Sequence, residues 1–96
     1  MSETLMRQEV SSAVETYEQV AHVSAIHTRR MIENHGEIEA LSSLMDNGDL
    51  QKGFKALRDS GQLDKSFEAV IIRYPEFFDT SVVEVATFRL EHADQL

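Results

Sequence analysis

The chain has 96 residues, a formal net charge of −8 and no cysteine. A chain of this length forms a single domain, residues 1–96, and without cysteine it has no disulfides, thiolate metal sites or thiol nucleophiles. The acidity disfavours nucleic acids and anionic membranes as partners, because it repels their phosphates. It would suit a basic protein partner, and the alternative is that it only keeps a small domain soluble. No apolar run is long enough to span a bilayer and no signal peptide is evident, so we expect a cytoplasmic protein.

The first predicted element is a long amphipathic helix over residues 3–35, with an apolar phase that continues to residue 45. Steps of four and three residues from Met6 follow one face of this helix, interrupted by polar side chains at Ser24, His27 and Asn34. Gly36 favours a break, since glycine is a natural residue after a helix end, whereas the unbroken phase favours one rod. Both alternatives stay open at this stage.

The apolar face of this helix exceeds what a few short helices can cover in so small a chain, so we predict a homodimer. A polar residue within such a seam fixes the register of the paired helices. The seam residues predicted to pair between two copies are Met6, Val10, Ala13, Tyr17, Val20, Ser24, His27 and Met31.

Three shorter helices are predicted over residues 50–60, 64–73 and 80–93, after an Asn-Gly turn at 45–49 and with Pro75 ending the second of them. Two segments rich in β-branched residues raise a strand alternative, but neither alternates and no hairpin turn joins them. The predicted fold is therefore all-α: a small, dimeric helical bundle in which the long N-terminal helix packs against three or four shorter ones. The residues expected in its core are Phe54, Leu57, Phe67, Val70, Ile71, Val85 and Phe88.

Motifs for catalysis or metal binding are lacking. Glu15, Glu18 and His22 share one helical face, but the Glu-x-x-His repeat of carboxylate-bridged di-iron bundles does not occur. None of the serines lies in a Gly-x-Ser-x-Gly elbow, and no glycine-rich phosphate loop is present. We therefore predict a protein that is not an enzyme, with no catalytic residues, metal site or cofactor.

Two segments are candidates for partner binding. Tyr74, Phe77 and Phe78 surround Pro75, where they either close the end of the core or contact another protein. The predicted function is a non-enzymatic protein–protein interaction module, such as a regulator, adaptor, inhibitor or small chaperone, acting as a homodimer. The alternative is a DNA-binding transcriptional regulator that uses a helix-turn-helix-like segment, 50–73. The basic residues of that segment are Lys52, Lys55, Arg58, Lys65 and Arg73.

Overall fold

The computed structural model describes residues 2–46 and 52–96, without the side chain of Lys52. Within these ranges every regular element is helical and none is a strand, which confirms the predicted all-α class. The Asn-Gly turn and the predicted start of the next helix fall on 47–51, outside the described residues. The elements in chain order are α1 (Ser2–Ala21), α2 (Ile26–His35), α3 (Glu37–Asp46), α4 (Lys52–Asp59), η1 (Leu63–Lys65), α5 (Phe67–Arg73), η2 (Pro75–Phe77), α6 (Thr80–Glu91) and η3 (Ala93–Gln95), where η marks a single 3₁₀ turn.

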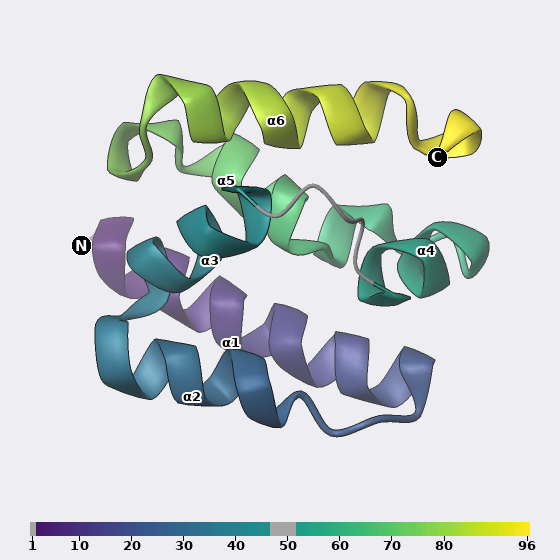
Figure 1. The fold of residues 1–96 in the computed structure, drawn as a ribbon, viewed down its shortest axis with the longest axis horizontal. Helices are drawn as coiled ribbons and strands as arrows, with labels where there is room; N and C mark the ends of the chain where they lie inside the picture. Colours follow the sequence, from purple (N-terminus) through teal and green to yellow (C-terminus); the bar gives the residue numbers. More distant parts are fainter. Residues whose placement is uncertain (1, 47–51) are drawn as a thin grey trace.

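The helices form a bundle with α6 along one edge and α2 along the opposite edge (Figure 1). Helices α1, α3, α4 and α5 lie between these two edges. The core takes side chains from α1, α3, α5 and α6, and its most deeply buried members include Met6, Val10, Leu41, Ile71 and Ala86. The inward face of α1 is therefore covered within the chain itself.

A close approach of α1 and α4 depends on a glycine. A Cβ atom built on Gly53 would lie 2.9 Å from two ring carbons of Tyr17, closer than real Cβ atoms come to a neighbour. Glycine weakens a helix relative to alanine by about 1 kcal/mol. Here it lets the ring of Tyr17 lie directly against the backbone of α4.

Most of the predicted core is confirmed: Phe54, Leu57, Phe67, Val70 and Ile71 are buried. Val85 is half-buried against the same cluster. The prediction for Phe88 is wrong, because 54% of this residue is exposed. The inward stripe of α6 and η3 instead consists of Val82, Ala86, Arg89 and Ala93.

Arg89 points inward because it has a counterion in the core. Its Nη1 lies 3.1 Å from Oε2 of Glu68 on α5, and both residues are buried, at 6% and 1% exposure. Burial raises the pKa of the Glu68 carboxyl, since apolar surroundings disfavour its charge more than its hydrogen bonds favour it. This pair joins α5 to α6 and fixes which face of α6 is turned outward.

The single long helix predicted over residues 3–35 is wrong, because the chain leaves the helix between Ala21 and Ile26. His22 takes a left-handed conformation with φ 56°, and the Glu18 carboxylate accepts a hydrogen bond from the backbone N–H of Ala25, at 2.8 Å. Arg29 also pairs with Glu18, at 2.5 Å. These contacts fold α2 back along α1. Of the two alternatives at Gly36, the structure has the break, with a φ of 86° at this residue, so the chain turns at both places.

The contacts of Glu18 predict a specific acid sensitivity. Hydrogen bonds from Arg29 and from the Ala25 backbone lower the pKa of this carboxyl from its ordinary 4.5 to about 2. A carboxylate with a lowered pKa stabilises the fold fully above its unfolded-state pKa, and this contribution is lost as the pH falls from about 4.5 to about 2. Urea denaturation of the wild type and Glu18→Gln should show the larger stability difference at pH 7 and a smaller one near pH 2. A difference that does not change with pH would contradict this assignment.

Candidate functional site

The eight residues of the predicted dimer seam do not lie on one common face. Met6, Val10 and Ala13 are buried in the core, while Tyr17, Val20 and Met31 are half-buried. Ser24 lies in the connection between α1 and α2 and His27 on α2, and both are exposed. The homodimer stays a prediction, but a continuous seam along one helix is not its basis in this fold.

The aromatic residues around Pro75 close one end of the core. Phe78 is buried, and Tyr74 and Phe77 pack half-buried against the core cluster. The Tyr74 hydroxyl donates a hydrogen bond to the Glu9 carboxylate, which raises the pKa of Tyr74. These contacts within the chain explain why aromatic side chains gather here.

In the segment predicted as a DNA-binding alternative, helix α5 is turned toward the core among the described residues. Residues 67–71 of α5 are all buried. Arg73, at the end of α5, is paired with Glu9, and Arg58 of α4 bonds to the carbonyl oxygens of Ala93 and Leu96. A recognition helix must present the side chains of one exposed face to base edges. Helix α5 presents them to the core instead.

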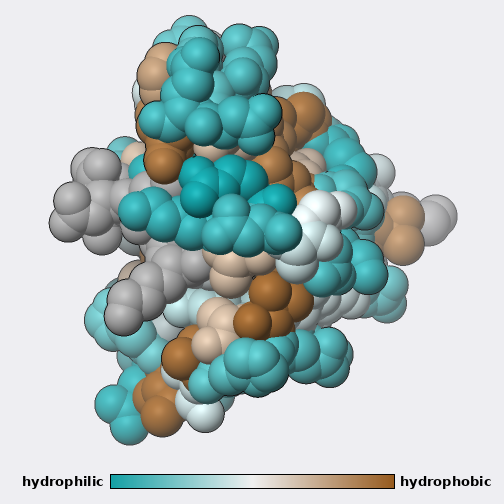
Figure 2. Space-filling model, turned by 90° about the vertical axis from the view of Figure 1, so that its right-hand side faces the viewer, coloured by the Kyte–Doolittle hydropathy of each residue, from teal (hydrophilic) through white to brown (hydrophobic). Residues whose placement is uncertain are grey.

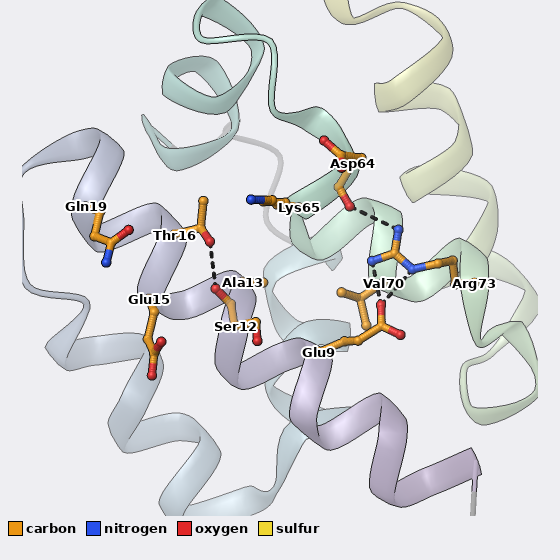
Figure 3. A pocket seen from close by; sticks show the side chains of 10 residues that line it. All are labelled: Glu9, Ser12, Ala13, Glu15, Thr16, Gln19, Asp64, Lys65, Val70 and Arg73. Atoms are coloured by element: carbon orange, nitrogen blue, oxygen red, sulfur yellow. Dashed lines mark hydrogen bonds and ion pairs between the residues drawn. The ribbon is translucent and has the colours of Figure 1, made fainter.

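A groove of about 510 Å³ lies between α1 and the segment from η1 to α5. Its floor contains Ala13 and Val70 (Figure 3). One end is closed by Arg73, which pairs with Glu9 at 2.6 Å and donates to the carbonyl oxygen of Asp64 at 3.0 Å. The ammonium of Lys65 points across the groove toward α1. The groove is thus shallow, polar and of mixed charge.

A different surface, on the outside of α6, combines an exposed ring with carboxylates. Glu84, Phe88 and Glu91 are spaced by four and three residues, so they share one face of the helix. The rings of Phe88 and His92 stack with centroids 4.3 Å apart. We call these four residues the α6 outer face. The sequence prediction missed it because Phe88 was assigned to the core.

The surroundings of the α6 outer face are also acidic. All five carboxylates of residues 76–96 are exposed, and no ion pair joins any of them to another described residue. The only arginine in this stretch, Arg89, is buried. These carboxylates belong to Glu76, Asp79, Glu84, Glu91 and Asp94.

Elsewhere the exposed apolar residues are scattered. Figure 2 shows a face covered mainly by hydrophilic residues, with separate hydrophobic areas near its top and its foot. Val23 and Ile26 are exposed at the connection between α1 and α2, and Leu5 is exposed near the start of α1. Single exposed apolar residues are normal on soluble proteins. Phe88 differs because it is an aromatic ring between carboxylates.

Other kinds of site have no assembled residues in the described ranges. No group of three or more histidine, aspartate or glutamate residues there is arranged to hold a metal ion. Helices with both the length and the apolar character needed to cross a membrane do not occur among residues 2–46 and 52–96.

Comparisons of the chain with protein-family models, with curated proteins and with solved structures found no match.

Proposed function

We propose that this protein is a non-enzymatic, cytoplasmic protein-binding module whose α6 outer face docks a basic amphipathic helix of a partner protein. The observation that carries the proposal is Phe88, 54% exposed between two carboxylates on the same helical face. Burying a phenylalanine side chain is worth about 1.5–3 kcal/mol, and roughly half of that gain is still open to a partner. Aromatic residues of this kind are the usual anchors of protein interfaces.

The shape of the surface favours a helix as the occupant. The α6 outer face is the ridge of a straight helix of twelve residues rather than a hollow. A second helix can pack alongside such a ridge with its own apolar residues on both sides of Phe88. Glu84 and Glu91 are seven residues apart, which is about 10 Å along the helix axis. That spacing matches lysine or arginine residues one heptad apart on the partner.

The charge of residues 76–96 supports a basic partner. Five exposed carboxylates lie in residues 76–96 with no exposed lysine or arginine among them. Such a surface attracts cationic segments and speeds their encounter, while it repels acidic ones. The contribution of charge falls with added salt, whereas the contribution of the Phe88 ring does not. Binding should therefore weaken with salt without vanishing.

Phe88→Ala should weaken binding of a basic amphipathic helix by at least about tenfold, as expected for removal of an interface anchor. The probe is a synthetic peptide of about 14 residues with leucine at heptad spacing and lysine elsewhere. Its affinity is measured by titration calorimetry against the wild type and the variant. The matched control is Leu5→Ala, because Leu5 is also 54% exposed but lies on α1.

Two further measurements separate a specific surface from general attraction to an acidic protein. A peptide with glutamate in place of lysine should not bind, and Glu84→Gln with Glu91→Gln should reduce the salt dependence of the lysine peptide. Equal affinities of the wild type, Phe88→Ala and Leu5→Ala would show that the α6 outer face is not the site.

A further inference from the structure

We infer that this chain forms a domain-swapped dimer, in which residues 22–25 become helical and α1 packs against α4, η1 and α5 of a second copy. The inference is independent of the proposed binding of a basic helix. It is carried by a conflict between the sequence pattern of residues 6–31 and the fold of this segment. In this dimer, the place of α1 against α4 and α5 is taken by α1 of the second, identical chain.

The helical spacing of apolar residues before and after the connection fits one helix, although the polar residues Ser24 and His27 lie in or beside the connection. The alternation of four and three residues that starts at Met6 runs through Val20, Ser24 and His27 to Met31 without a shift of phase. Neither glycine nor proline occurs between Val20 and Ile26. Such a stretch is compatible with a continuous helix, in contrast to the break at Gly36, where glycine takes a φ of 86°.

The closed form holds the connection in an unfavourable conformation. His22 has φ 56°, a left-handed conformation that side chains other than glycine seldom adopt. If a continuous helix replaced this turn, His22 would have ordinary helical backbone angles. The N–H of Ala25, which now bonds to the Glu18 side chain, would bond to the carbonyl of Ala21. Opening the connection therefore relieves strain and leaves this backbone donor satisfied.

The contact between α1 and α2 within one chain is sparse. Only Thr28 is buried among the ten residues of α2, and Val10, Val14 and Ile32 line a hollow of about 160 Å³ where α1 meets α2. A continuous helix over residues 2–35 would be roughly 50 Å long. The longest dimension of the molecule is 32 Å. With the connection straightened, α1 would thus extend beyond the rest of its own chain.

A second copy restores what α1 loses on leaving. Met6, Val10 and Ala13 need an apolar core, and an identical chain supplies the same one. The ion pair between Glu18 and Arg29, at 2.5 Å, would form between copies instead of within one. Exchange of an identical helix is a low-cost route to a dimer, because the contacts between copies are the same contacts that form within one chain.

The direct experiment uses two charge variants, Glu18→Arg and Arg29→Glu. In each variant, residues 18 and 29 carry charges of the same sign. These like charges face each other between α1 and α2 both in the monomer and in a dimer of two copies of that variant. A swapped dimer of one copy of each variant has opposite charges at both of its α1–α2 contacts. The two are unfolded together in urea, refolded and examined by native mass spectrometry. We expect the mixed dimer to exceed the statistical half of all dimers. A statistical distribution, or a wild type that stays at 10.9 kDa up to about 100 µM, would overturn the inference.

A second pair of variants tests the connection without altering any ion pair. His22→Gly relaxes the left-handed conformation and weakens a continuous helix, whereas His22→Ala does the reverse. His22 is exposed, so both variants keep the core. The dimer of His22→Ala should dissociate with a constant at least about tenfold lower than that of His22→Gly, because two connections change per dimer. Equal dissociation constants for the two variants, or a lower constant for His22→Gly than for His22→Ala, would also overturn the inference.

Discussion

Arg89→Met is expected to lower the free energy of unfolding by about 3–5 kcal/mol, because it leaves the Glu68 carboxyl buried without its counterion. The pair has a distance of 3.1 Å and exposures of 6% and 1%, so water cannot replace the guanidinium. A domain of this size has a total stability on the order of 5–14 kcal/mol. The variant should therefore unfold at a much lower urea concentration, which is measured by circular dichroism.

The double variant Glu68→Leu with Arg89→Met is the control for this prediction. Replacing both charges by apolar side chains removes the cost of burying them, so most of the lost stability should return. In Arg89→Met alone, the pKa of Glu68 should rise further, because the hydrogen bond and charge of Arg89 no longer lower it. An acid with a raised pKa destabilises the fold as the pH rises above its unfolded value, so Arg89→Met should lose less stability at pH 4 than at pH 7. A double variant no more stable than Arg89→Met would contradict this account of the pair.

Phe67→Ala should cost about 3–5 kcal/mol through the cavity that it leaves in the core. Phe67 starts α5 directly after Ser66, whose hydroxyl caps the helix by accepting from the N–H of Ala69 at 3.1 Å. Its ring packs next to Tyr17 and Phe54, where little free space is present. The side chains around Phe67 cannot fill the space of the missing ring unless α4 or α5 moves.

Phe88→Ala is the matched comparison for Phe67→Ala, because the same atoms are removed from an exposed position. We expect it to change the free energy of unfolding by no more than about 1 kcal/mol. Thermal and urea denaturation of both variants measure the contrast directly. Similar losses for the two variants would show that Phe88 is buried, and the α6 outer face would then not exist as described.

Local sequence signals predicted much of the helical architecture. Ser66 and Pro75 mark the start and end of α5, and Gly36 marks the boundary between α2 and α3, because each of these residues favours a backbone conformation at a helix end. The turn at residues 22–25 carries no such signal. It depends on Glu18 reaching Ala25 and Arg29, a tertiary arrangement that helical periodicity does not encode.

The orientation of α6 could not be predicted for a similar reason. Its apolar residues are spread around the helix, so periodicity alone placed Phe88 inside. What turns Phe88 outward is the buried position of Arg89, and that position requires Glu68 from another helix. A charged residue within an otherwise apolar stripe is buried only when a partner meets it there. The candidate binding surface is thus a consequence of a buried ion pair.

The measurement that tests the proposed function most directly is a nuclear magnetic resonance titration of the isotope-labelled protein with the lysine–leucine peptide. If the peptide binds the α6 outer face, the largest changes in backbone amide chemical shifts occur in residues 84–95, and Phe88→Ala removes these changes. Changes centred instead on the groove between α1 and α5, which Glu9 and Arg73 close at one end, would contradict the proposal.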